Sequence, residues 1–141
     1  MPTLDPFAGP GFAAMTDLSK AVDDDAVLPL GLVELIKLRC SQVNGCTYCV
    51  RMHIQKAVNA GEAQDRVDNV ADWQTHPSFT EQERTIFALA ESITLVADTH
   101  VDDGILDAAI ANWGPALTQQ VVWVVAVINA FNRVAITARI D

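Results

Sequence analysis

Helix start and stop signals recur along the whole of this chain. Proline, glycine and capping residues divide it into segments of helical length, and no stretch shows the alternation of apolar and polar residues that a strand between hairpin turns would have. Seven helices are expected, over residues 12–24, 29–44, 46–60, 62–73, 81–97, 105–113 and from 115 onward, with residues 1–11 extended ahead of them. The sequence therefore predicts an all-α fold of six or seven helices in a single domain, 1–141.

Some of these boundaries carry specific capping sequences. Gly45 follows the second expected helix and Gly61 ends the third, as glycine commonly does at helix C-termini. Thr80 and Glu83 have the spacing of a capping box, in which the threonine side chain faces the Glu83 amide and the glutamate reaches back.

The composition argues against some classes of partner. The formal net charge of −9 at pH 7 argues against nucleic acid and anionic membrane surfaces, which both select for Lys and Arg. The longest apolar run, residues 121–128, is shorter than the ~20 residues that cross a bilayer, so a buried core helix is expected there. The 50% hydrophobic content is rich for a monomer of this length and predicts a homo-oligomer.

The N-terminus and the cysteine content indicate a compartment. Residues 1–15 have neither a basic region nor an apolar core, so no signal peptide is expected. Three cysteines without an export signal indicate a reducing, cytoplasmic location. A CxxC pair in that compartment is catalytic or metal-binding before it is structural.

Residues 45–53, GCTYCVRMH, hold the clearest chemical signal in the chain. Cys46, Cys49 and His53 lie at i, i+3 and i+7, so they share one face near the start of a helix. The positive end of the helix dipole stabilises a thiolate, and a histidine four residues after Cys49 can act as its base. The spacing predicts a redox-active dithiol that cycles with a disulfide.

Other interpretations of these residues stay open. Cys40, Cys46, Cys49 and His53 have ligand types that suit zinc, but all four come from one 14-residue stretch instead of two separate knuckles. The cysteines could also be inert buried hydrophobes, which is the interpretation favoured for Cys40. Position at the helix start favours Cys46 as the attacking sulfur, whereas the neighbouring histidine favours Cys49.

Residues 34–62, ELIKLRCSQVNGCTYCVRMHIQKAVNAGE, resemble the core of the alkylhydroperoxidase D-like proteins of the carboxymuconolactone decarboxylase family. That core has a glutamate twelve residues before the first cysteine, then CxxCxxxH, then an alanine-rich turn ending in glycine. Two later stretches, TEQERTIFALAESIT and VINAFNRVAI, are similar to the family's next helix and to its C-terminal INxxNR sequence. The resemblance extends over most of the chain.

The resemblance implies a role for each residue of the motif. Cys49 would be the peroxide-reactive sulfur and Cys46 the resolving one, with His53 as the neighbouring base. The best-studied members carry a histidine just before the second cysteine, where this chain has Tyr48. A relay through that position would use a phenol, which passes a proton through its hydroxyl but is a poor base at neutral pH.

Glu34 is assigned to the site by the resemblance alone. On a helical wheel it lies opposite the apolar arc of its helix, which predicts a solvated glutamate paired with Lys37. The family pattern instead implies that Glu34 orients and helps to deprotonate the cysteine–histidine unit.

Three further polar residues lie on the apolar last helix. Arg133 follows a mostly apolar stretch, so a buried guanidinium would need an acid, and Glu83 is the candidate partner. The alternative is that Glu83 serves only in the capping box. Asn129 and Asn132 share its face and are expected to form helix–helix hydrogen bonds.

The expected activity is that of a thiol peroxidase or disulfide reductase. Its partners would be a peroxide and a small dithiol or lipoyl-bearing protein as reductant, and no haem, flavin or metal cofactor is implied. A decarboxylase of the carboxymuconolactone type is an alternative, although that branch does not need the CxxC pair. A non-enzymatic, zinc-stabilised helical oligomer is another.

Overall fold

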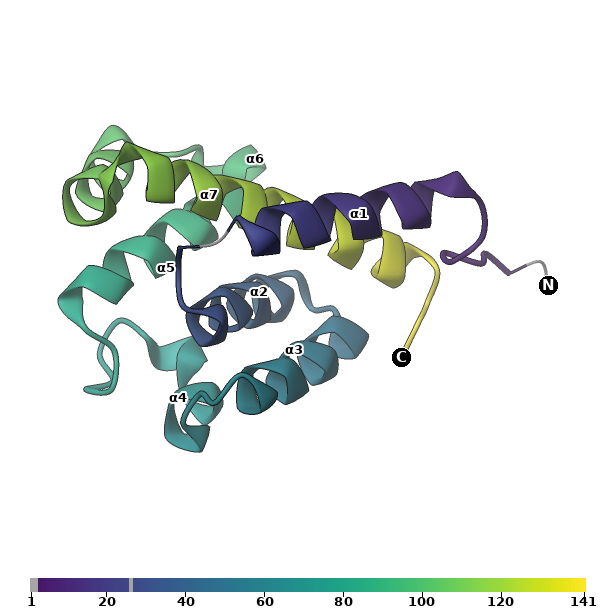
Figure 1. Ribbon diagram of the computed structural model, residues 1–141, viewed down its shortest axis with the longest axis horizontal. Coiled ribbons are helices and arrows are strands. Elements are labelled where there is room, and N and C mark those ends of the chain that lie inside the picture. The colour runs from purple at the N-terminus through teal and green to yellow at the C-terminus, as the bar shows by residue number, and fades with distance from the viewer. Residues whose placement is uncertain (1–2, 26) are drawn as a thin grey trace.

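The computed structural model describes residues 3–25 and 27–141, and this part of the chain contains helices and no strand (Figure 1). The helices are α1 (Pro10–Asp24), α2 (Leu30–Asn44), α3 (Thr47–Asn59), α4 (Gln64–Asp68), η1, a 3-10 turn (Val70–Asp72), α5 (Glu81–Thr94), α6 (Val96–Thr99) and α7 (Asp103–Thr137). The predicted all-α fold of six or seven helices is confirmed.

Helix α2 runs through the middle of the bundle, with α3, α5 and α7 packed against it (Figure 1). Ten of its 15 residues are buried. A helix covered on several sides loses the one-sided apolar stripe of a surface helix, and its polar residues are buried with the rest. Helix α1, in contrast, has no buried residue and lies along α7.

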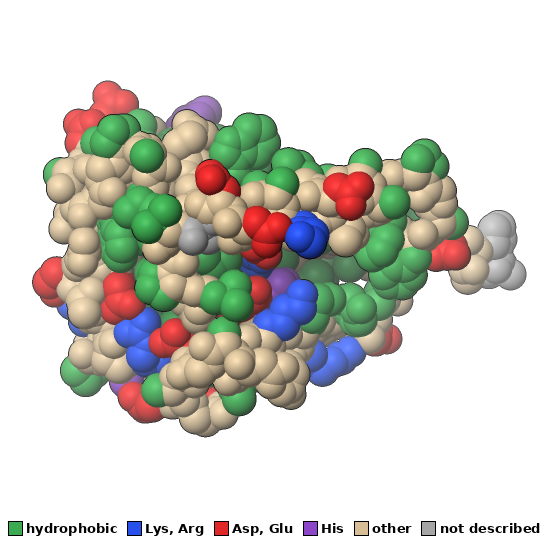
Figure 2. Space-filling model, viewed as in Figure 1, with side chains coloured by type: hydrophobic (Ala, Val, Ile, Leu, Met, Phe, Trp, Pro, Cys, Tyr) green, Lys and Arg blue, Asp and Glu red, His purple; other side chains and the backbone are tan. Residues whose placement is uncertain are grey.

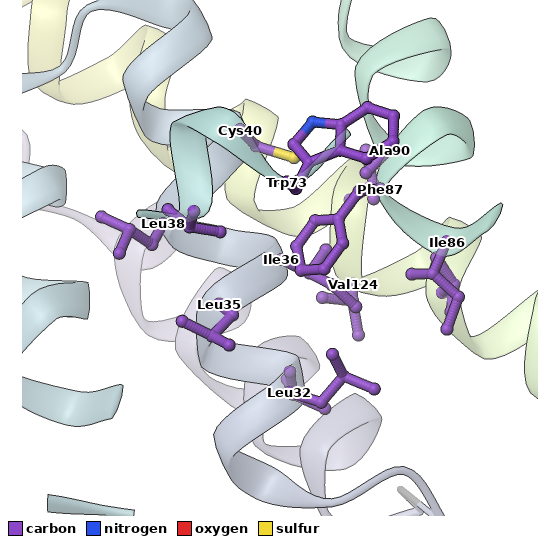
Figure 3. Close-up of a cluster of buried hydrophobic side chains, with 14 of the residues drawn as sticks. Leu32, Leu35, Ile36, Leu38, Cys40, Trp73, Ile86, Phe87, Ala90 and Val124 are labelled. Atoms are coloured by element: carbon purple, nitrogen blue, oxygen red, sulfur yellow. The ribbon is translucent and has the colours of Figure 1, made fainter. Parts of the chain in front are cut away.

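The main core forms where α2 meets α5 and the segment around η1. The rings of Trp73 and Phe87 are stacked with centroids 6.0 Å apart, and Phe79 meets Phe87 edge-on at 5.5 Å. Figure 3 shows Trp73 and Phe87 close to Ile36 and Cys40 of α2. This cluster of buried side chains fixes α2 against α5, and with it the helix end that leads to the CxxC sequence.

Several predicted boundaries differ from the structure. The helix expected over residues 62–73 is divided into α4 and η1. At residue 114, in contrast, the expected break is present: Gly114 keeps non-helical angles (φ 80, ψ 162) inside α7, so two helices meet there at a kink. Glycine adopts such a positive φ without steric cost, and Pro115 is suited to the first turn of the following helix.

The segment predicted to be extended, residues 1–11, is only partly so. Residues 1–2 lie outside the described part of the chain. Asp5 forms a turn by accepting hydrogen bonds from the Phe7 and Ala8 amides at 3.0 and 3.3 Å. Helix α1 then starts at Pro10, before the expected start, because proline is favoured in a first helical turn.

The capping box at the start of α5 is confirmed, but the predicted partner of Glu83 is wrong. The Glu83 amide donates to Thr80 Oγ1, and the Thr80 amide donates to Glu83 Oε1, both at 3.0 Å. Arg66 of α4 donates to both carboxylate oxygens of Glu83, at 3.0 and 2.6 Å. Arg133 is exposed and donates hydrogen bonds to Asn129. Its guanidinium stays in contact with solvent and does not need a carboxylate partner.

Helix α7 is long and apolar enough to cross a membrane by length and composition, yet 44% of its most apolar 18-residue stretch is buried inside the molecule. The core role predicted for residues 121–128 is borne out by four side chains that are at most 2% exposed: Val121, Val124, Val125 and Ile128. Trp123 lies on the opposite side and is 50% exposed.

Candidate active site

The two cysteines of the CxxC sequence lie at the turn between α2 and α3. Gly45 ends α2 with φ 72 and ψ 30, a left-handed conformation that glycine adopts without the steric cost of a Cβ atom. Cys46 is the N-cap of α3, and its Sγ accepts a hydrogen bond from the Cys49 amide at 3.3 Å. The two Cα atoms are 5.3 Å apart and the sulfurs form a disulfide. The turn therefore brings both sulfurs together while α3 stays regular.

A carboxylate and an imidazole lie together beside this turn. Glu34 of α2 is 4% exposed and His53 of α3 is 5% exposed, and Glu34 Oε2 is 2.7 Å from His53 Nδ1. The helical-wheel prediction of a solvated Glu34 is wrong, because α2 is covered on this side as well. The salt bridge to Lys37 is present, at 3.7 Å between Nζ and Oε1. The structure thus brings Glu34 and His53 together as the family resemblance implies.

The charge state of Glu34 follows from its surroundings. Burial alone would raise the pKa of this carboxyl, but the hydrogen bond with His53 and the charges of Lys37 and Lys56 outweigh it and hold the pKa below its ordinary value. An ionised carboxylate can only accept, so His53 Nδ1 carries the proton and donates it to Glu34. His53 Nε2 is then the ring nitrogen that can accept a proton.

A cavity of about 750 Å³ lies beside the Cys46–Cys49 pair, with walls from α1, α2, α3 and the C-terminal part of α7. Cys49 and His53 line it, whereas Cys46 is not part of its wall. Most of the wall is apolar, through side chains that include Phe12, Leu28, Met52, Ile128, Phe131 and Val134. Figure 2 shows a hollow in this face of the molecule, with histidine and basic side chains visible inside it. An organic molecule in the cavity would meet the sulfur of Cys49.

Residues 10–92 match the carboxymuconolactone decarboxylase family. The chain belongs to this family. The matched region contains both cysteines of the disulfide and the Glu34–His53 pair. The uncharacterised protein YdfG of Bacillus subtilis (strain 168) is 31% identical over 103 residues, which are 73% of this chain and 70% of YdfG. The uncharacterised protein YnjA of Escherichia coli (strain K12) is 30% identical over 86 residues, 60% of this chain and 47% of YnjA.

Solved structures show the same fold. A protein of unknown function from Agrobacterium tumefaciens, described as a candidate antioxidant defence protein AhpD, has a TM-score of 0.93 at 26% identity and covers 100% of this chain and 97% of its own. The debrominase Bmp8 in its apo form has a TM-score of 0.82 at 21% identity, over 90% of this chain and 68% of Bmp8. A cysteine-to-alanine variant of Bmp8 in complex with 2,3,4-tribromopyrrole has a TM-score of 0.83 at 20% identity. The family's AhpD-like fold is therefore the fold of this chain.

The two sulfurs of this family member differ in access. Both cysteines are buried, at 2% exposure for Cys46 and 3% for Cys49. Only Cys49 reaches the cavity wall. Tyr48 is half-buried, lines the same cavity and packs against the cluster formed by Cys46, Cys49 and Ala135. In the part of the chain that the structure describes, no hydrogen bond joins His53 to either sulfur.

Cys40 belongs to a different part of the molecule. It is 1% exposed and packs in the main core, away from the Cys46–Cys49 cluster. Burial raises the pKa of its thiol to about 11, with a hydrogen bond from Thr94 opposing that rise. Across residues 3–25 and 27–141, no group of three or more His, Cys, Asp or Glu side chains could hold a metal ion.

A network of side-chain amides joins the turn before the CxxC sequence to α7. Asn44 Nδ2 donates to Asn129 Oδ1 at 3.0 Å and to Asn132 Oδ1 at 2.9 Å. Asn132 is fully buried and donates to Ser41 Oγ at 3.0 Å. The helix–helix bonding expected of Asn129 and Asn132 is therefore present, and it holds the last turn of α2, just before Cys46.

Sequence reasoning missed two partners of the site. Asn44 is the last residue of the second expected helix, and a side-chain amide at a helix end can bond to a neighbouring helix, as Asn44 does to α7. Asp23 of α1 forms an ion pair with Lys37 at 2.9 Å, and nothing in the local sequence points to that contact. Lys37 itself, paired with Glu34 on the helical wheel, is 4% exposed and not solvated.

Proposed function

We propose that this protein is a thiol-dependent peroxidase that reduces organic peroxides at Cys49. The observation that carries the proposal is the position of the Cys46–Cys49 disulfide, one sulfur of which faces a largely apolar cavity that His53 also lines. The imidazole is oriented by a buried carboxylate. A reducible sulfur pair, a base and room for an organic molecule are what this reaction requires.

The reaction starts from the reduced dithiol. His53 Nε2 takes the proton of Cys49, and the thiolate attacks the terminal oxygen of the peroxide ROOH. The O–O bond breaks, Cys49 becomes a sulfenic acid, and the alkoxide takes the proton from His53 and leaves as the alcohol ROH. The Cys46 thiol then attacks the sulfenic sulfur, which forms the disulfide and releases water.

Two electrons must then return to the disulfide. A small dithiol or a lipoyl-bearing protein would supply them by thiol–disulfide exchange, attacking at Cys49 because that sulfur is the one on the cavity wall. These steps require no haem, flavin or metal. The antioxidant role attributed to the structural neighbour from Agrobacterium tumefaciens is consistent with the same chemistry.

Replacement of each cysteine separates the two roles. In Cys46→Ser protein, stoichiometric peroxide should leave a sulfenic acid on Cys49 that dimedone traps, and turnover should stop because the resolving thiol is missing. Cys49→Ser should lose both the adduct and the turnover. Cys40→Ser is the matched control and should keep full activity. An adduct found on Cys46 but never on Cys49 would reverse the roles, and wild-type protein that consumes no organic peroxide would refute the proposal.

Reductive dehalogenation is a second candidate. The debrominase Bmp8 shares the fold, and the apolar cavity beside Cys49 would accept a halogenated ring. The same dithiol balances that reaction, since an aryl bromide and two thiols give the arene, hydrogen bromide and the disulfide. Bromide release from a brominated pyrrole, compared with peroxide consumption under the same conditions, decides which substrate class is reduced.

Thiol counting separates the remaining alternatives. Both reductive activities turn two thiols into a disulfide, which titration with Ellman's reagent detects. A carboxymuconolactone-type decarboxylase would release carbon dioxide with no change in thiol content. A zinc-stabilised oligomer would instead show stoichiometric zinc that protects the thiols from the reagent.

A further inference from the structure

A buried row of charged side chains connects the redox site to α1. Lys37 Nζ lies 2.9 and 3.1 Å from the two carboxylate oxygens of Asp23 on α1, and 3.7 Å from Glu34 Oε1. The second oxygen of Glu34, Oε2, is bonded to His53 Nδ1 at 2.7 Å. The side chains of Lys37 and Glu34 are each 6% exposed, that of His53 is 7% exposed and that of Asp23 is 27% exposed. The row therefore runs without a break from α1 to the imidazole beside Cys49.

Lys37 contacts two carboxylates, which is one more than a structural ion pair requires. A buried ammonium must have an acid partner, and Asp23 alone, with both oxygens within hydrogen-bond distance, meets that need. Lys37 nevertheless also faces Glu34, a second carboxylate that already has His53 as a partner. One positive charge is thus shared between two carboxylates, and only one of them contacts the base.

We propose that Lys37 and Asp23 are positioning residues of the redox site, in which Lys37 keeps Glu34 ionised and Asp23 limits how much of the lysine charge Glu34 receives. An ionised Glu34 holds the proton of His53 on Nδ1 and leaves Nε2 as the acceptor for the thiol proton. Helix α1, which carries no cysteine or histidine, then belongs to the redox site through Asp23. This inference rests on the proposed function, because it concerns how the base of that reaction is prepared.

Few other charges face Glu34 within residues 3–25 and 27–141. Helix α3 presents Lys56, whose charge also favours the ionised carboxylate, and Tyr48 on the cavity wall. The cavity wall from α7 is apolar. The charged pairs on the neighbouring elements are satisfied among themselves: Lys20–Asp24 on α1, Arg39–Glu91 between α2 and α5, and Glu62–Arg66 beside the start of α2. Among the lysines near Glu34, Lys37 therefore acts more strongly than Lys56, and Asp23 reaches Glu34 through its contact with Lys37.

Charge sharing and simple bracing give different results on substitution. Lys37→Gln removes a positive charge beside Glu34, so the pKa of Glu34 should rise. Asp23→Asn removes a negative charge and leaves the lysine to Glu34 alone, so the pKa should fall below its already lowered value. If the Lys37–Asp23 contact only holds α1 against α2, both substitutions break that contact. Both should then move the pKa of Glu34 in the same direction.

The direct test is the titration of the Glu34 carboxyl by NMR, in reduced protein with isotope-labelled glutamate and with Glu34→Gln for assignment. We expect shifts of about half a pKa unit to one unit, upward for Lys37→Gln and downward for Asp23→Asn, with the double variant between them. Asp24→Asn is the matched control: it removes the same charge one residue along α1 at a side chain that is 65% exposed, so it should leave Glu34 nearly unmoved.

A second measurement follows the chemistry without peroxide. In Cys46→Ser protein, the acid limb of the alkylation rate of Cys49 by iodoacetamide should move to higher pH with Lys37→Gln and to lower pH with Asp23→Asn. Shifts in one shared direction, or shifts no larger than that of Asp24→Asn, would overturn the proposal. If Lys37→Gln does not fold, Asp23→Asn decides: a fall in the pKa of Glu34 supports charge sharing, and a rise or no change refutes it.

Failure of the proposed function would look different. Neither measurement depends on peroxide turnover. Opposite shifts of the Glu34 titration in a protein that consumes no peroxide would keep the charge-sharing inference and reject the peroxidase. Peroxide turnover that stays normal while both variants shift the titration alike would reject the inference and keep the peroxidase.

Discussion

The contact between α4 and α5 allows a quantitative test of which residue neutralises Glu83. Arg66 donates to both oxygens of this carboxylate, at 3.0 and 2.6 Å, and to the Ser78 carbonyl at 2.6 Å. Its guanidinium also lies 4.9 Å from the centre of the Phe79 ring. Glu83→Gln keeps the shape of the side chain and its capping position but removes one of the two carboxylate charges that Arg66 contacts, the other being that of Glu62.

The expected loss of stability in Glu83→Gln lies between the values for an exposed and for a fully buried ion pair. The Arg66 and Glu83 side chains are 17% and 15% exposed, so the pair should contribute more than the ~0–1 kcal/mol of a surface ion pair and less than the ~3–5 kcal/mol lost when a fully buried pair is broken. We expect Glu83→Gln to lower the free energy of unfolding by about 2 kcal/mol at neutral pH. For a domain of this size, that corresponds to a fall in Tm of about 6–10 °C.

The loss should depend on pH in a defined direction. Burial opposes ionisation of Glu83, but the hydrogen bonds from Arg66 and from the Thr80 amide outweigh it and hold the pKa of Glu83 below the ordinary value of 4.5. A carboxyl with a lowered pKa in the folded state stabilises the protein above its unfolded pKa, and this stabilisation is lost as the pH falls through the folded pKa. The difference between wild type and Glu83→Gln should therefore be complete at neutral pH and shrink below pH 4.5.

Chemical denaturation of a double-mutant cycle identifies the partner. Glu83→Gln and Arg66→Met should show a coupling energy of about 1–2 kcal/mol, whereas Glu83→Gln and Arg133→Met should be additive within ~0.5 kcal/mol. Glu81→Gln is the matched control, because it removes the same charge two residues earlier on α5, at a side chain that is 89% exposed. A coupling energy between Glu83 and Arg133, or no coupling energy between Glu83 and Arg66, would show that the contact between α4 and α5 is not the one described.

Three further outcomes are expected. Asn132→Ala should destabilise the protein by about 2 kcal/mol in urea denaturation, because it removes two hydrogen bonds between α7 and α2, one from Asn44 and one to Ser41, and leaves each of these partners with a single remaining bond. Cys40 should resist iodoacetamide at neutral pH until the protein unfolds, since burial raises the pKa of its thiol to about 11, and mass spectrometry of alkylated native protein checks this. The chain should form a homo-oligomer through apolar side chains that include the 50% exposed Trp123, so Trp123→Glu should reduce the mass measured by light scattering, and a wild-type monomer at micromolar concentration would contradict this expectation.

Local signals predicted the helices well, because a capping residue acts within a few positions of itself. Thr80 and Glu83 form the expected capping box, and Gly45 ends α2 in the left-handed conformation that its place after Asn44 indicated. The CxxC spacing likewise fixes the two sulfurs on adjacent positions of one turn, so the disulfide could be expected from the sequence.

The prediction for Glu34 failed because a helical wheel assumes that one side of a helix faces water. Helix α2 has neighbours on several sides, so Glu34 and Lys37 are buried although they lie away from the main apolar arc. Only the family resemblance assigned Glu34 to the site. Burial of an acid on such a helix could be predicted only if the central helix of the bundle were known. The sequence does not say which helix is central.

Contacts between distant segments were the other source of error. Arg66 lies in a short polar segment whose own pattern gives no sign of burial, and its partner is 17 residues further along the chain. Asp23 likewise meets Lys37 across the connection between α1 and α2. Such pairings depend on how the helices are arranged. By charge alone, more than one arginine could pair with Glu83, so the sequence did not identify the correct one.

The walls of the cavity come from separate stretches of the chain. Cys49 and His53 lie within residues 10–92, whereas Phe131 and Val134 lie on α7, outside that family-matching region. A change of side-chain size at either α7 position would reshape the space beside the sulfur and leave the two cysteines and His53 in place. Gene duplication followed by substitutions on one face of α7 would therefore be enough to produce two proteins that share a reaction and differ in the molecules they accept.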